Sequence, residues 1–113
     1  MISRINIRKD VQIGLRLNED EYLKVNLLAK YHRLSKSSYI NELIKDFSDT
    51  FKRHLSVGKR ERQISVRLSE VDFQILESKA SEEGVSSQNY IRMLIHSVTL
   101  PHNIEDKIVI KTK

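Results

Sequence analysis

The chain has 113 residues, 39% hydrophobic and 31% charged, a balance typical of one compact domain or of two small modules that need each other. It contains no cysteine, which excludes disulfides and thiolate metal sites and fits a reducing cytoplasm. A net charge of +5 favours a polyanion as partner, and no apolar run approaches the roughly 20 residues that span a bilayer, so we expect a soluble protein without membrane contact.

The first predicted element follows an N-terminal arm, residues 1–10. Residues 11–17 alternate between apolar and polar side chains, which predicts a half-buried strand. Ile13, Leu15 and Leu17 share its apolar face. The other face is polar.

Two helices are predicted after this strand, within a first repeat that covers residues 11–52. Asn18 has the side chain of a helix N-cap and is followed by acids, which the helix dipole favours. Ser35 is the expected N-cap of the second helix. Their apolar stripes are Tyr22, Val25 and Ala29 in the first helix, and Tyr39, Ile40, Leu43, Ile44 and Phe47 in the second.

The same pattern returns after a linker, residues 53–61, with Gly58 as a helix breaker. Residues 62–98 repeat the first unit without a gap at an offset of 51 positions, and a tail, residues 99–113, follows. Ser69 and Ser86 are the expected N-caps of the two helices in this second repeat. Gly84 is the expected stop of the first of these, where the first repeat has Arg33. Identical pairs include Gln12/Gln63, Arg16/Arg67, Leu17/Leu68, Glu19/Glu70, Ser35/Ser86, Tyr39/Tyr90, Leu43/Leu94 and Ile44/Ile95.

Neither repeat is expected to fold alone, because a unit below about 40 residues with a lone strand buries too little surface and leaves its backbone groups open. We therefore predict a mainly α fold with a short two-stranded antiparallel β-ribbon. The order is β-α-α-β-α-α, and the two repeats form one domain.

Each repeat consists of a strand, a capped helix, a short turn and a second capped helix, and the polar face of its strand carries Gln, a small residue and Arg. This arrangement resembles the ribbon-helix-helix family of DNA-binding proteins. Arc and MetJ are known strand readers of this kind. A chain with two units is similar to the tandem members, including the TraY-type accessory proteins of plasmid conjugation. The resemblance implies sequence-specific binding of double-stranded DNA through a ribbon in the major groove, as a transcriptional repressor or as a plasmid transfer (relaxosome) accessory protein.

The candidate base-reading face follows from an antiparallel pairing centred between Gly14 and Ser65. It places Gln12 opposite Arg67 and Arg16 opposite Gln63. Arg can donate twice to guanine, and Gln can pair with adenine, in the major groove. Taken singly these are ordinary surface residues, so repetition at equivalent positions carries the prediction. The candidate base contacts are Gln12, Gly14, Arg16, Gln63, Ser65 and Arg67.

Two further groups are candidates for phosphate contacts. The starts of the second helices offer open N–H groups, hydroxyls and a positive dipole end, although Ser is also an ordinary N-cap. The basic run before the second strand suits phosphate steering, although a solvated charge cluster is the default for such runs. The candidates are Ser35, Lys36, Ser37, Ser86, Ser87 and Gln88, together with Lys59, Arg60 and Arg62.

An enzyme is not expected, since the four histidines show no ligand spacing with acids and no glycine-rich phosphate loop is present. We therefore expect no cofactor and no metal. One alternative is an antitoxin whose tail binds a toxin partner, with Ile108, Val109 and Ile110 adding a strand to it. Others are a domain-swapped homodimer and self-association on adjacent DNA sites.

Overall fold

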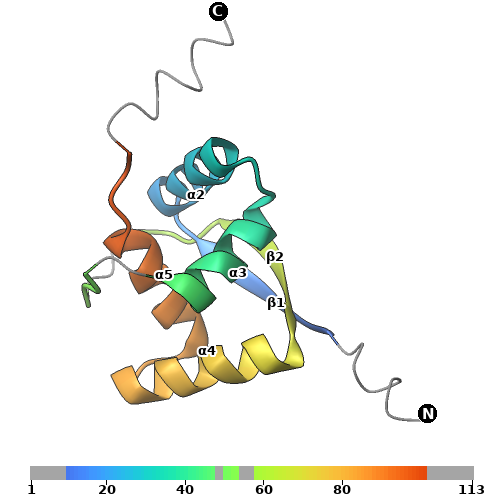
Figure 1. The fold of residues 1–113 in the computed structure, drawn as a ribbon. Helices are drawn as coiled ribbons and strands as arrows, with labels where there is room; N and C mark the ends of the chain where they lie inside the picture. Colours follow the sequence, from blue (N-terminus) through green and yellow to red (C-terminus); the bar gives the residue numbers. More distant parts are fainter. Residues whose placement is uncertain (1–9, 48–49, 54–57, 102–113) are drawn as a thin grey trace, which may run out of the picture.

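The computed structural model describes residues 10–47, 50–53 and 58–101, and this part of the chain contains six elements (Figure 1). The expected N-terminal arm, apart from residue 10, and the tail beyond residue 101 lie outside these ranges. In chain order the elements are β1 (Asp10–Leu17), α2 (Glu19–His32), α3 (Lys36–Asp46), β2 (Arg62–Ser69), α4 (Glu70–Glu83) and α5 (Ser87–Ser97). The predicted order of elements is confirmed.

The two strands pair antiparallel and form a sheet of their own. Gly14 lies opposite Ser65, Gln12 opposite Arg67, and Arg16 opposite Gln63, which is the predicted register. A slip of one residue would turn every apolar side chain of a strand to the solvent, so the buried face holds this register in place.

One face of the ribbon belongs to the core, and the helices cover it (Figure 1). Leu15, Leu17, Val66 and Leu68 are fully buried there, and Ile64 nearly so. Each side chain of this kind contributes about 1.5–3 kcal/mol when it leaves water. The helices meet these side chains with apolar residues of all four stripes, among them Val25, Ile40, Ile44, Leu76, Ile91 and Ile95.

All four predicted N-caps are confirmed. The side chains of Asn18, Ser35, Ser69 and Ser86 accept hydrogen bonds from backbone N–H groups in the first turn of their helices. Asn18 forms a complete capping box with Glu21, in which side chain and backbone pair in both directions at 2.8 Å. Ser69 is also the last residue of β2, so the strand passes into α4 without a loop.

Equivalent residues end α2 and α4, and both adopt the left-handed backbone conformation. Gly84 has φ 70°, and Arg33, 51 positions earlier, has φ 60°. The next residues, Leu34 and Val85, donate backbone hydrogen bonds to Ala29 and Ala80, which closes the same C-terminal motif twice. The expected stop at Gly84 is confirmed, and Arg33 performs the same turn with a side chain that disfavours it.

Arg33→Gly should therefore raise the free energy of unfolding by about 1 kcal/mol, because glycine adopts positive φ without a clash of its Cβ. Urea denaturation followed by circular dichroism measures the change. The reciprocal variant Gly84→Arg should lower the stability by a similar amount. If Arg33→Gly proved destabilising, the Arg33 side chain would have to make contacts that outweigh the backbone strain.

Candidate nucleic-acid interface

The outer face of the ribbon carries every predicted base-contact residue. Gln12, Gly14 and Arg16 on β1 are exposed, as are Gln63, Ser65 and Arg67 on β2. They alternate with the buried residues because successive side chains of a strand point to opposite faces. The structure thus brings all six onto one surface of two antiparallel strands.

This outer face differs between its two halves. At one end the Gln12 Nε2 donates to Ser65 Oγ at 2.6 Å. At the other end Gly14 has no side chain, and the Gln63 amide lies across it, with Nε2 only 3.0 Å from the place a Cβ would take. Gln63 Oε1 is then 3.5 Å from an Arg16 guanidinium nitrogen. The two glutamines are therefore presented differently, although they occupy equivalent positions of the repeat.

The backbone of each strand is held from its outer edge by the second helix of the opposite repeat. The Arg67 N–H donates to Ser37 Oγ at 3.0 Å, and the Arg67 carbonyl accepts from Asn41 Nδ2 at 3.1 Å. On the other side the Arg16 N–H donates to Gln88 Oε1 at 3.2 Å, and the Arg16 carbonyl accepts from Arg92 Nε at 2.8 Å. Ser37 and Gln88, like Asn41 and Arg92, stand 51 positions apart.

These contacts have two consequences. They occupy backbone groups that an edge strand would otherwise offer to another chain. They also fix the starts of α3 and α5 beside the ribbon, at the backbone of the two candidate arginines. Sequence reasoning missed Asn41 and Arg92. The available signal was a polar residue, at the same place in both repeats, next to the apolar stripe of the second helix.

Arg92 is the more deeply embedded member of this pair, with 9% of its surface exposed. Its guanidinium also donates to Asn89 Oδ1 at 2.6 Å and to Gln88 Oε1 at 3.0 Å. Burial lowers the pKa of Arg92, and the nearby Arg60 charge lowers it further. The group remains a cation at neutral pH, because an arginine has so high an ordinary pKa.

The predicted phosphate-contact residues at the helix starts lie where they were expected, on either side of the ribbon. Ser35 and Ser86 are exposed, and their hydroxyls accept from Ser38 N at 3.0 Å and Asn89 N at 3.1 Å. Ser87 is half-buried at the first turn of α5. The acceptor oxygens of Ser37 and Gln88 are engaged with the strands, so their remaining donors are the groups that could meet a phosphate.

The basic candidates are held in different ways. Lys59 is exposed, whereas the Arg60 side chain is 27% exposed and turns towards Glu21, with a nitrogen–oxygen distance of 4.0 Å. Arg62 pairs with Glu19 at 3.1 Å and lies 3.9 Å from the centre of the Tyr22 ring.

Tyr22 contacts a second candidate cation besides Arg62, since Lys36 Nζ lies 5.5 Å from the centre of its ring. The hydrogen bond from Arg62 lowers the pKa of Tyr22, and the charge of Lys36 adds to the effect. The same hydrogen bond raises the pKa of Arg62. Tyr22 thus places Arg62 and the start of α3 together, which its position in the apolar stripe did not indicate.

Within residues 10–47, 50–53 and 58–101, no group of histidine and acidic side chains could hold a metal ion. No helix in those same ranges is long and apolar enough to cross a membrane.

Part of the chain is similar to a known family. A family model described as "NikA-like: Mobilization protein NikA" matches residues 58–111, just under half of the chain. The matched part contains β2, α4 and α5. No curated protein and no solved structure matches the chain. The second half is therefore similar to a family of plasmid mobilization proteins.

Arg92→Met should lower the free energy of unfolding by about 1–2 kcal/mol, because the Arg16 carbonyl and the side chains of Gln88 and Asn89 lose a charged partner. Part of this loss is offset, because the variant no longer buries the charged guanidinium group. Asn41→Ala, which removes one neutral hydrogen bond at the matching position, should cost about 1 kcal/mol. Urea denaturation compares the two. An Arg92→Met variant more stable than the natural chain would show that the burial cost dominates.

Gly14→Ser should leave the stability within about 0.5 kcal/mol, because the new Cβ meets only the mobile end of Gln63. It should displace that amide and make the two halves of the outer face alike. Thermal unfolding tests the first expectation, and sequences selected from a random duplex pool test the second. Selected sites identical to those of the natural chain would show that Gly14 has no part in the asymmetry.

Proposed function

We propose that one chain forms a complete ribbon-helix-helix unit, with its two repeats related by a pseudo-two-fold axis, and binds double-stranded DNA by inserting β1 and β2 into the major groove. The observation that carries the proposal is the antiparallel register, which places Gln12, Gly14 and Arg16 opposite Arg67, Ser65 and Gln63. All six residues are exposed. A two-stranded ribbon fits a groove about 12 Å wide.

The matched contacts at the ribbon edges support the pseudo-two-fold relation. Arg16 is held by α5 and Arg67 by α3 through residues 51 positions apart, so each repeat supports the strand of the other. Such mutual support is what two separate chains provide in an intertwined dimer. Here a single chain supplies both halves, and its strands are free to differ.

In the bound state Arg16 and Arg67 are the proposed guanine readers, since a guanidinium can donate to O6 and N7 together. Gln12 and Gln63 are the proposed adenine readers. Gly14 against Ser65 makes the two halves unequal, because Gln12 is tied to a hydroxyl and Gln63 lies over a glycine. We therefore expect a nearly, but not fully, palindromic site.

The DNA backbone would be gripped on both sides of the ribbon by the starts of α3 and α5, where backbone N–H groups and the helix dipole favour a phosphate. Ser35, Lys36 and Ser37 form one clamp, and Ser86, Ser87 and Gln88 form the other. Lys36 makes the first clamp more positive. Lys59 is exposed, and its positive charge attracts the DNA. Arg60 and Arg62 contribute mainly long-range electrostatic attraction, because Glu21, Glu19 and Tyr22 already contact their side chains.

For the biological role, the match to mobilization proteins favours a plasmid transfer accessory protein over a transcriptional repressor. An accessory of this kind marks a transfer origin by occupying or bending DNA and needs no active site of its own. The antitoxin alternative depends on the tail, most of which lies outside the described residues, and nothing in the described part of the chain favours it.

The decisive experiment is the selection of bound sequences from a random duplex pool at physiological salt. We expect a short, slightly asymmetric motif, together with a mass near 13.3 kDa for the free chain. Absence of any enriched motif would remove sequence-specific recognition, and a free mass of twice that value would favour the swapped homodimer.

On the selected site, Arg16→Ala and Arg67→Ala should each cost about 1–3 kcal/mol and relax the preference at one base pair, as expected for a bidentate contact to guanine. Lys45→Ala, which removes an exposed charge near the end of α3, serves as the control. It should weaken all sequences slightly and equally. Equal losses on selected and scrambled duplexes for the arginine variants would reduce both residues to backbone contacts.

A further inference from the structure

The outer face of the ribbon has a fourth pair of residues at one end. Asp10 is the first residue of β1 and lies opposite Ser69, the last residue of β2. Alternation in the sequence predicts the strand only from Val11 onward, and the structure extends it by this one residue. Asp10 is exposed, and because side chains of a strand alternate, it shares the face of Gln12 and Arg16.

The other end of the ribbon has no such pair. The ladder ends there at Leu17, and the next residue, Asn18, is buried as the N-cap of α2. Glu61 stands 51 positions after Asp10 and is exposed, but it precedes β2 and is not paired with β1. The outer face therefore extends further at the end that carries Arg67.

The carboxylate of Asp10 is available to a ligand. Within residues 10–47, 50–53 and 58–101 it has neither a hydrogen-bond donor nor an ion-pair partner. It lines a polar hollow together with Ser65, Arg67 and Ser69 of β2 and with the start of α3. The Ser69 hydroxyl already accepts from the Asp72 N–H at 3.1 Å. Asp10 is therefore the acceptor that this end of the outer face presents.

A carboxylate on a face that reads DNA discriminates between bases by its chemistry. When ionised it only accepts hydrogen bonds, so the acceptor atoms of guanine and thymine in the major groove cannot satisfy it. The N4 amino group of cytosine is a donor that a carboxylate can accept from. Adenine also has a donor, N6, but its neighbour N7 is an acceptor that a carboxylate cannot meet. Asp10 is thus suited to cytosine.

We propose that Asp10 is a further base-reading residue, which accepts a hydrogen bond from the N4 amino group of a cytosine. This role rests on the proposed insertion of the ribbon into the major groove. Two residues of a strand span about 7 Å, roughly the rise of two base pairs, so the cytosine lies up to two pairs beyond the bases that Gln12 and Arg67 contact. It lies at one end of the site only, because the ribbon has a fourth pair at one end only.

The test is the selection of bound sequences from a random duplex pool, with the natural chain and with Asp10→Ala and Asp10→Asn. The natural chain should prefer cytosine about tenfold at one flanking position, within the usual cost of a mismatched pair. Asp10→Ala should lose that preference. Asp10→Asn should move it to adenine, because an amide can accept from N6 and donate to N7. Both variants should fold as the natural chain does, and circular dichroism checks this.

The matched control is Glu61→Gln, which removes an equivalent exposed charge from outside the ladder. Loss of an acidic side chain weakens the repulsion of phosphates, so this variant and both Asp10 variants should bind all duplexes somewhat more tightly. Only the Asp10 variants should change the selected bases. A change of the flanking base in Glu61→Gln as well would reduce Asp10 to a general electrostatic effect.

Asp10 is not a base reader if the natural chain selects an inner motif without cytosine at either flank, or if Asp10→Ala keeps the cytosine. Nor is it one if Asp10→Ala alters only the base pair assigned to Arg67, because it would then act through that arginine. In all these outcomes an inner motif is still selected, so the proposed DNA binding stands. Absence of any enriched motif, in contrast, removes the sequence-specific binding itself and the role of Asp10 with it.

Discussion

The fold depends on the hydrogen-bonded pairing of β1 with β2. Each repeat has one strand, and a lone strand exposes its backbone donors and acceptors. A repeat of this size also buries too little apolar surface to fold alone. Pairing solves both problems together. It joins the apolar rows of the two strands into one surface, which the four helices cover, and it sends the polar rows outward as a continuous face.

The second helices then complete the pairing from the outside. By holding the backbone of Arg16 and Arg67, α5 and α3 occupy the strand edges and tie each repeat to the other. The same contacts bring two helix starts beside the candidate base readers. One set of hydrogen bonds thereby fixes the spacing between the ribbon and the proposed phosphate clamps, and recognition would require little further ordering of the backbone.

Because the two repeats lie in one chain, their residues can also differ. Gly14 against Ser65 changes how the two glutamines lie, and Arg33 against Gly84 preserves one turn with different backbone strain. A further difference lies away from the ribbon, where Phe51 is stacked on Tyr90 and His32 is stacked on Tyr39. A dimer of identical chains cannot show such differences, since any substitution appears in both halves.

Much of the fold could be predicted from the sequence, because it depends on local patterns of residues. Alternation of apolar and polar residues predicted both strands, Asn18, Ser35, Ser69 and Ser86 predicted the helix starts, and the offset of 51 positions predicted the pairing partner. These features depend on the chemistry of neighbouring residues and on a period, and both are visible in one dimension. The exposed outer face follows from them directly, because the side chains of a strand alternate.

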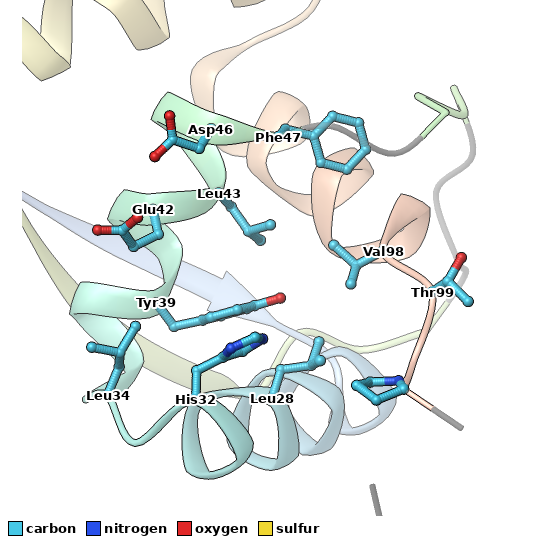
Figure 2. A pocket seen from close by; sticks show the side chains of 11 residues that line it. Leu28, His32, Leu34, Tyr39, Glu42, Leu43, Asp46, Phe47, Val98 and Thr99 are labelled. Atoms are coloured by element: carbon cyan, nitrogen blue, oxygen red, sulfur yellow. The ribbon is translucent and has the colours of Figure 1, made fainter. Parts of the chain in front are cut away.

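Other features were decided only by the tertiary structure. The bonds of Asn41 and Arg92 to the opposite strand, the turn of Arg60 towards Glu21, and the gathering of Lys36 and Arg62 around Tyr22 all join residues from different elements. So does the hollow lined by Leu28, Leu43 and Val98 (Figure 2), whose walls come from α2, α3 and the residues after α5. No local pattern specifies which long side chain reaches which partner, because that choice is made by the packing of helices on the ribbon. The sequence by itself determined which residues face outward on the ribbon, and the tertiary structure decided which of the surrounding cations are already engaged within the protein.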